Sequence, residues 1–262
     1  MEDNTVKTVF QQNMANIANK VYPVAGKTVL EIASDPWLLS AKQFKSLGAA
    51  RVIASDIFDN WMQVPDDPDI ETGLIDARNI PAVLGEQSVD VVYAINLLEH
   101  LSDLQQALDS IDRALKPGGF AFLHGHPLWS SARGHHVVLG YRGGNVKFGT
   151  PTDPIPKWGH LYMTPEQMGD DLRGRGLPDE VVNACLRWSF IADEITRMPR
   201  NAILAEFRKY AERGSLSIRA IWQDRLEIPT TDDLRAIRSS RWWDETEDYG
   251  VRGMTIILDK RA

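Results

Sequence analysis

The hydrophobic positions in the first half of the chain switch between helical and strand-like spacing. Residues 5–21 place apolar side chains three and four positions apart, which predicts an amphipathic helix. Residues 97–115 carry leucines on one helical face, and Lys-Pro-Gly-Gly at residues 116–119 ends that helix. Strand-like apolar runs stand at residues 27–32, 50–56, 71–76, 89–96 and 119–125. Strands that alternate with helices indicate βαβ units and therefore a parallel sheet.

The pattern changes after Pro127. Residues 130–162 are rich in glycine, proline and aromatic side chains, which indicates long loops or short strands. Residues 165–213 have a helical pattern, and Thr164 and Gln167 are placed to form a capping box at its start. The second half of the chain is therefore organised differently from the first.

These elements predict an α/β fold of the Rossmann-like, doubly wound type, with a mostly parallel sheet and helices on both of its faces. Residues 1–127 are expected to form the core. Residues 128–250 are expected to form a mainly helical and loop insertion over the carboxyl edge of the sheet. Residues 251–262 contain a final strand that completes the core sheet.

Charge and composition restrict the partners of this protein. The chain has 262 residues, a formal net charge of −7 and no cluster of lysine and arginine, which argues against a nucleic-acid surface. The single cysteine, Cys185, rules out an internal disulfide and fits a reducing compartment. No signal-like segment and no apolar run of about 18 residues is present, so we expect a cytoplasmic protein with no membrane contact.

Three segments follow one another in an order that carries a family resemblance. They are Val29–Asp35 (VLEIASD), Leu74–Pro81 (LIDARNIP) and the strand, helix, Lys-Pro-Gly-Gly turn and strand of residues 88–123. Together they resemble the class I S-adenosylmethionine-dependent methyltransferases over roughly residues 20–127. The resemblance implies a core that binds S-adenosylmethionine and an insertion that recognises the acceptor.

The resemblance also assigns roles to side chains at the strand ends. Asp56 would take the two ribose hydroxyls, Asp76 and Ala77 would meet the adenine, and Asn96 would line the pocket. Glu31 would hold the amino group of the methionine end. The full predicted cofactor set is Glu31, Ala33, Ser34, Asp35, Trp37, Asp56, Ile57, Asp76, Ala77 and Asn96. From the residues alone, Glu31 and Asp56 could also be explained as solvated strand-end acids.

The first turn departs from the family pattern, because residues 31–37 lack all three of the glycines that the family has there. Ser34 or Asp35 can cap the following helix, with Pro36 at its first position, so amides at a helix start would still face the ligand. Asp35 would attract the ammonium of the cofactor and repel its carboxylate. The alternative is a fold kept for structure, with Trp37 filling the space of the methionine end.

Histidines and aromatic residues after the fifth strand are the candidates for chemistry on the acceptor. His126, His135 and His136 are predicted as catalytic residues, because a histidine near its normal pKa can take a proton from a hydroxyl. Metal binding is the weaker interpretation and no metal site is predicted, while ordinary hydrogen bonding in a loop stays open. The predicted substrate wall, with core packing as its alternative, consists of Trp129, Tyr141, Trp158 and Tyr162.

The sequence thus predicts a methyltransferase that uses S-adenosylmethionine on a small-molecule acceptor. Transfer to an oxygen of a sugar or natural-product intermediate is favoured, with nitrogen and carbon acceptors open. The alternative function is a catalytically inactive protein of the same fold that binds a partner or serves as a scaffold. A nicotinamide-dependent oxidoreductase is disfavoured because the G-x-G-x-x-G pattern is absent. A homodimer is left open.

Overall fold

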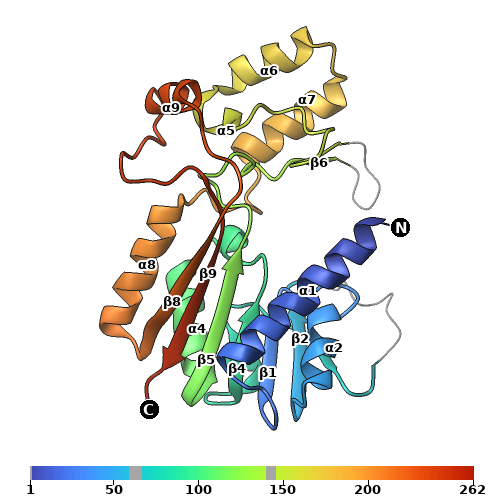
Figure 1. Cartoon of the computed structure of the whole chain (residues 1–262), viewed down its shortest axis with the longest axis vertical. Helices are drawn as coiled ribbons and strands as arrows, with labels where there is room; N and C mark the ends of the chain where they lie inside the picture. Colours follow the sequence, from blue (N-terminus) through green and yellow to red (C-terminus); the bar gives the residue numbers. More distant parts are fainter. Residues whose placement is uncertain (1, 59–66, 140–145) are drawn as a thin grey trace.

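A computed structural model describes residues 2–58, 67–139 and 146–262 of the chain. Its main element is a seven-stranded sheet in the order β3-β2-β1-β4-β5-β9-β8 (Figure 1). The strands are β1 (Thr28–Ile32), β2 (Arg51–Asp56), β3 (Glu71–Leu74), β4 (Val89–Ala94), β5 (Leu115–Gly125), β8 (Leu216–Arg225) and β9 (Val251–Lys260). Strands β1 to β5 are parallel, and β9 runs antiparallel to both of its neighbours.

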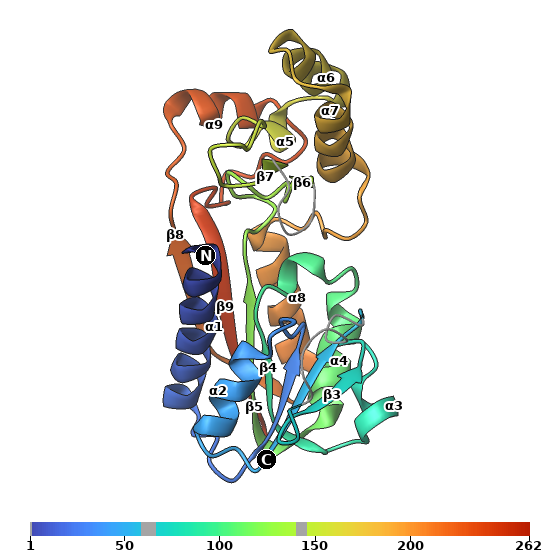
Figure 2. The same cartoon turned by 90° about the vertical axis from the view of Figure 1, so that its right-hand side faces the viewer.

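Helices cover both faces of the sheet, as Figure 2 shows from the side. One face carries α1 (Glu2–Val21) and α2 (Leu39–Ser46). The other carries α3 (Ile80–Leu84), α4 (Leu104–Ala114) and α8 (Arg200–Arg213). Successive strand residues point to opposite faces, so Val29 packs with the first set of helices and Leu30 with the second. This arrangement confirms the predicted fold class, including the mostly parallel sheet.

The connection from β4 to β5 follows the sequence prediction in part. The predicted helix over residues 97–115 is divided into a 3₁₀ turn at Leu98–His100 and the helix α4, which Asp103 caps by accepting a hydrogen bond from the Gln106 amide. Helix α4 ends at Ala114, and the Lys-Pro-Gly-Gly residues 116–119 lie in the first part of β5 rather than in a turn. Gly119 is required there, because a Cβ atom would lie 2.8 Å from the Lys116 carbonyl oxygen.

The sheet contains one strand that the sequence analysis did not predict. Residues 216–225 were expected within the insertion, but they form β8, which pairs with the final strand β9. The helix α8 precedes β8 and packs on α4, where Asp112 accepts hydrogen bonds from the Tyr210 hydroxyl and the Ser215 amide, both at 2.9 Å. Residues 200–225 are therefore part of the core, and this corrects their predicted place in the insertion.

The remaining residues form a layer over the carboxyl edge of the sheet (Figure 1). We call residues 128–199 and 226–250 the cap. Its elements are β6 (Val138–Leu139), β7 (Val146–Lys147), α5 (Gly159–Tyr162), α6 (Pro165–Gly174), α7 (Asp179–Leu186), a π-helical turn (Arg187–Ile191) and α9 (Thr231–Arg238). The capping box at Thr164 and Gln167 is present. The predicted helical region 165–213 is interrupted after α6 and again after the π-helical turn.

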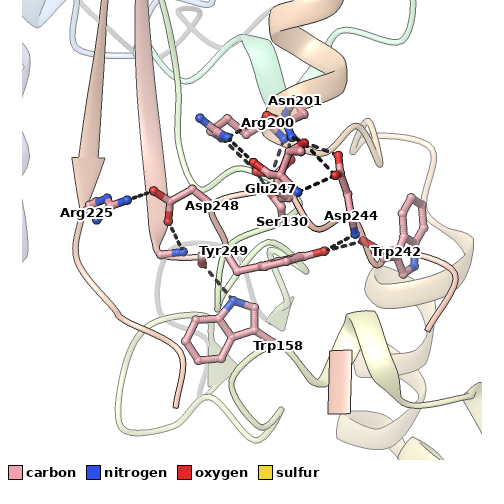
Figure 3. Close-up of polar contacts among 12 residues, drawn as sticks. Ser130, Trp158, Arg200, Asn201, Arg225, Trp242, Asp244, Glu247, Asp248 and Tyr249 are labelled. Atoms are coloured by element: carbon pink, nitrogen blue, oxygen red, sulfur yellow. Dashed lines mark hydrogen bonds and ion pairs between the residues drawn. The ribbon is translucent and has the colours of Figure 1, made fainter. Parts of the chain in front are cut away.

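A polar network joins the end of the cap to the core (Figure 3). The Glu247 carboxylate accepts hydrogen bonds from the Arg200 guanidinium at 2.9 Å and from the Asn201 amide at 2.8 Å, at the start of α8. Ser130, at the start of the cap, reaches the same carboxylate at 3.4 Å. Nearby, the Trp158 indole donates to the Tyr249 carbonyl oxygen at 3.1 Å. These bonds hold the two ends of the cap against the core.

None of the helices in the described ranges is long and apolar enough to cross a membrane.

Candidate active site

The candidate site lies where the parallel strands end beneath the cap (Figure 1). In an open parallel sheet, ligands bind beyond the carboxyl ends of the strands, next to the point where the strand order reverses. Here that point lies between β1 and β4, which are neighbours in the sheet although β2 and β3 separate them in sequence. The residues that follow β1, β2 and β4 therefore come together at one edge.

Glu31 is a buried acid at the end of β1. Its side chain is only 2% exposed, and the Ser34 hydroxyl donates to it at 3.1 Å. Burial, aided by the nearby negative charge of Asp35, raises the pKa of Glu31 to about 8. The interpretation of Glu31 as a solvated strand-end acid is therefore wrong, and a cation placed beside it would favour its ionised form.

The turn after Glu31 differs from the predicted capped helix start. Helix α2 begins at Leu39 rather than at Pro36, and Ala33 and Leu38 both have a positive φ of 57°. The Asp35 carboxylate accepts hydrogen bonds from the Trp37 and Leu39 amides, each at 2.9 Å. Alanine thus keeps the left-handed conformation that glycine adopts readily, and Asp35 binds amides that would otherwise face a ligand.

Trp37 does not lie in the protein interior. Its side chain is 39% exposed, whereas the hypothesis of an inactive protein expected it to fill the space of the methionine end. Ser34, three residues earlier, is buried beside Glu31. The turn therefore leaves the tryptophan at the surface and points the small polar side chain inward.

The next two strand ends carry the acids Asp56 and Asp76. Asp56 accepts hydrogen bonds from the Ile57 amide at 2.6 Å and the Phe58 amide at 3.1 Å. Asp76 forms an ion pair with Arg78 at 2.6 Å, which holds the pKa of Asp76 below its usual value. Ala77 beside it is buried, whereas Ile57 is exposed. Both carboxylates stand at the edge that the sequence predicted.

Asn96 and Glu99 follow β4 and carry side-chain oxygens that lack hydrogen-bond partners. Asn96 has a φ of 57°, and its side-chain oxygen is buried without a partner. Glu99 is 1% exposed, and neither of its carboxyl oxygens has a partner. Burial raises the pKa of Glu99 to about 8, although the backbone amides of Glu99 and His126 act in the other direction. The nearest ring nitrogen, Nε2 of His100, is 4.0 Å from Glu99 Oε1.

The sequence analysis did not select Glu99 as a site residue. One signal was available: an acid stands inside the apolar run Asn-Leu-Leu-Glu-His-Leu of residues 96–101, directly after a buried strand. In such a run an acid is either at a turn to solvent or buried at a strand end. Only the packing of the chain separates these two cases.

The histidines at the end of β5 and in the segment after it form two groups with different surroundings. His124 and His126 stack with ring centroids 6.1 Å apart at the strand end, and burial lowers the pKa of His126 to about 4. Nε2 of His136 lies 2.7 Å from the Pro127 carbonyl oxygen, and Nε2 of His135 lies 3.6 Å from Asp153. Burial lowers the pKa of both His135 and His136, so each is neutral inside the cap.

The histidines were selected on the assumption that their pKa values are near normal, and these surroundings correct that assumption. His135 and His136 are enclosed in the cap, and their contacts are those of structural residues. His126 is half-buried at the end of β5, on the same edge as Glu99. A catalytic role of His126 stays a prediction.

The comparison with known proteins identifies the domain. A family model described as a methyltransferase domain matches residues 39–123, which include α2, β2 to β4, α4 and most of β5. The chain therefore contains a segment that matches a methyltransferase domain, and it has the Rossmann-like fold of class I methyltransferases. No curated protein matches the sequence.

Solved methyltransferase structures match nearly the whole chain. A putative methyltransferase from Bacillus halodurans C-125 is 13% identical, with 95% of this chain and 99% of that chain covered and a TM-score of 0.53. The putative methyltransferase in complex with the Haloferax volcanii Trm112 methyltransferase activator is 14% identical, with 100% and 95% covered and a TM-score of 0.52. Geranyl diphosphate C-methyltransferase from Streptomyces coelicolor A3(2) is 12% identical, with 95% and 77% covered and a TM-score of 0.51. At these identities the likeness concerns the fold.

The residues at the strand ends can be tested for their fit to S-adenosylmethionine. The buried Glu31 carboxyl suits an ammonium group, and the unpartnered Asn96 side-chain oxygen requires a hydrogen-bond donor. The amides of Trp37 and Leu39 already bind Asp35, so they do not suit the cofactor carboxylate. The site therefore fits the cationic part of the cofactor, and a carboxylate needs other donors.

The predicted substrate wall is mostly part of the cap interior. Trp129 and Trp158 are each 1% exposed and pack in one apolar cluster of the cap. Packing explains both, which corrects their predicted place in an acceptor wall. Tyr162 is partly buried against the same cluster, and its acceptor contact stays a prediction. Tyr141 lies outside the described residues.

Among the described residues, no group of three or more histidine, cysteine, aspartate or glutamate side chains is arranged to hold a metal ion.

Proposed function

We propose that this protein transfers a methyl group from S-adenosylmethionine to a hydroxyl oxygen of a small molecule, with a sugar or natural-product intermediate favoured. The observation that carries the proposal is the buried Glu31 carboxyl at the end of β1, in a domain that matches methyltransferases. Burial raises the pKa of this carboxyl to about 8, and strongly perturbed carboxyls at strand ends cluster at functional sites.

Each strand end has a task in this proposal. Glu31 would bind the ammonium of the cofactor, Asp56 its ribose hydroxyls, and Asp76 with Ala77 its adenine edge. The cofactor supplies an electrophilic methyl group on a sulfonium. The cap would exclude water and place the acceptor over the strand ends, with Tyr162 and His126 as its candidate contacts.

Calorimetric titration with S-adenosylmethionine and S-adenosylhomocysteine tests the proposal. We expect micromolar binding of both, weakened roughly 30-fold by Asp56→Ala, because a charged hydrogen bond contributes about 2 kcal/mol. The control is Asp109→Ala, an exposed carboxylate on α4, which should leave the dissociation constant unchanged. No heat with either ligand, from protein whose circular dichroism shows it folded, would contradict the proposal.

A second candidate is a protein of this fold that binds no cofactor and serves as a scaffold. Its support is the Asp35 carboxylate, which binds the Trp37 and Leu39 amides as a ligand would. The exposure of Trp37 speaks against it, because the tryptophan is not packed into the interior. If this candidate is correct, Asp35→Ala will also fail to bind either ligand.

A further inference from the structure

We propose that Glu99 is the catalytic base on the acceptor side of the site: its carboxylate contacts the acceptor hydroxyl and takes the proton that the oxygen loses on methylation. This inference rests on the proposed function. It assigns the proton transfer to a residue outside the predicted histidine set.

The position of Glu99 is set by two neighbouring strands. The 3₁₀ turn that carries Glu99 follows β4 closely, and the Leu97 amide donates to the His124 carbonyl oxygen of β5 at 2.9 Å. Glu99 Oε2 lies only 3.0 Å from the point where a Cβ atom on Gly125 would stand. The carboxyl therefore occupies space at the end of β5 that a side chain at position 125 would fill.

The cap holds this turn from the other side. The Thr196 amide donates to the Glu99 carbonyl oxygen at 2.7 Å, and Nδ1 of His100 lies 2.7 Å from the Glu194 carbonyl oxygen. The ring of His100 also packs edge-on against His136 of the cap, with centroids 5.5 Å apart. The backbone of Glu99 is thus fixed at the junction of core and cap, where an acceptor would enter.

Neither oxygen of the Glu99 carboxyl has a hydrogen bond of normal geometry, and only the backbone amides of Glu99 and His126 act on it, lowering its pKa against the effect of burial. Of the described carboxyl groups, Glu99 is the one in which both oxygens are buried and neither has a hydrogen-bond partner. Buried polar groups in folded proteins are almost always hydrogen-bonded, because an unmet group costs about 1–3 kcal/mol. The buried, unpartnered oxygen of Asn96 belongs to the same segment after β4. Two sets of unmet acceptors in one segment indicate a ligand that brings donors, as a hydroxyl compound does.

The proton balance of the transfer fits a carboxylate at this place. The cofactor supplies the methyl group, whose carbon–sulfur bond breaks with the electron pair left on sulfur while a lone pair of the acceptor oxygen forms the new carbon–oxygen bond. The oxygen then carries an excess proton, which Glu99 accepts and later releases to water. Because burial raises the pKa of Glu99 to about 8, its carboxylate is a stronger base than a solvated glutamate.

Other ionisable groups surround the turn, and none replaces Glu99. Burial lowers the pKa of His126 to about 4 and that of His136 to about 3, so their neutral rings are much weaker bases than the Glu99 carboxylate. The ionisable groups that face Glu99 or its neighbour His100 are His100, His126, His136, Asp56 and Glu194. A positive charge brought near Glu99 should therefore remove its proton.

Proton release on ligand binding tests this placement before any acceptor is known. S-adenosylmethionine and S-adenosylhomocysteine share the ammonium that Glu31 would bind, and they differ by the charged methylsulfonium. Calorimetry at pH 7 in phosphate and in Tris measures the protons released with each ligand. We expect S-adenosylmethionine to release up to one proton more than S-adenosylhomocysteine, and Glu99→Gln to abolish this difference.

Three comparisons make the result decisive. Glu247→Gln, at a buried carboxylate that has partners, should keep the difference in proton release. Glu99→Met should raise the melting temperature by about 2–8 °C, because it removes a buried unmet carboxyl. Once an acceptor is found, Glu99→Gln should lower kcat by at least roughly 100-fold, with S-adenosylmethionine affinity within about threefold.

Each outcome has a separate meaning. Equal proton release by the two ligands in the wild type, or an unchanged difference in Glu99→Gln, overturns the role of Glu99 and leaves the proposed function standing. Failure of both ligands to bind the folded wild type overturns the proposed function, and the inference with it.

Discussion

Buried carboxyl groups in the cap and at the strand ends of the core have different surroundings. In the cap, Glu247 is paired with Arg200, and Asp153 is paired with Arg133 at 2.9 Å. At the strand ends, neither acid has an ion-pair partner that forms a hydrogen bond: Glu31 is approached by hydroxyl and amide donors, and the Glu99 oxygens have no hydrogen bond of normal geometry. Burial is common to all four residues, so burial alone does not indicate function. The paired carboxylates of the cap hold the protein together, whereas the unmet oxygens of Glu99 are the feature on which its proposed role rests.

The largest expected effect comes from removing a hydrogen-bonded carboxylate from the cap. Glu247→Ala should lower the free energy of unfolding by about 3–5 kcal/mol, because it leaves the buried Arg200 guanidinium without its partner. The matched control is Glu71→Ala, which breaks the exposed pair with Arg51 and should cost less than about 1 kcal/mol. Both are measured by denaturant unfolding. Similar losses in the two variants would remove the distinction between bonded cap carboxylates and surface pairs.

The pH dependence of stability tests the strand-end acids. Glu31 and Glu99 have folded-state pKa values of about 8 against an ordinary value of 4.5, so the native state keeps protons that the unfolded chain has lost. Their stabilising effect is complete below pH 4.5 and is lost as the pH rises through about 8. The loss amounts to about 1.4 kcal/mol per pH unit for each group.

The buried histidines have the opposite effect on the acid side. Their folded-state pKa values lie far below the ordinary value of 6.5, so stability falls as the pH drops below that value. They are the buried His124, His135, His136 and His160 and the half-buried His126. We expect maximum stability near about pH 6.5 in urea titrations. Glu31→Gln and Glu99→Gln should each flatten the alkaline side, and a slope unchanged in both would contradict the assigned pKa values.

The smallest expected effect concerns the glycine-free turn. Ala33→Gly should raise the free energy of unfolding by about 1 kcal/mol, because alanine at a φ of 57° is strained and glycine is not. Ala41→Gly, within the helix α2, is the control and should lower stability by about 1 kcal/mol. Thermal unfolding of both variants measures whether each substitution raises or lowers stability. A loss in Ala33→Gly would show that the turn is not strained.

Local pattern was enough to predict the parallel strands, the alternation with helices and the capping box at Thr164. These features depend on spacing and on short-range hydrogen bonds, which a sequence displays directly. Strand β8 was missed because it is an edge strand: one of its faces is largely solvated, and Arg219, Asp224 and Arg225 interrupt its apolar pattern. Its place in the sheet depends on pairing with β9, which is distant in sequence.

The sequence by itself determined the class I fold, because residue periodicity specifies which face of each strand and helix is buried. It also placed Glu31, Asp56 and Asp76 at strand ends. Tertiary structure alone decided which of the buried groups have partners. His135 and His136 are enclosed in the cap by contacts with segments that the local pattern does not reveal, and Glu99 is isolated between β5 and a cap loop. A buried group's pKa and its unmet hydrogen bonds arise from neighbours far along the chain, and only folding brings those neighbours together.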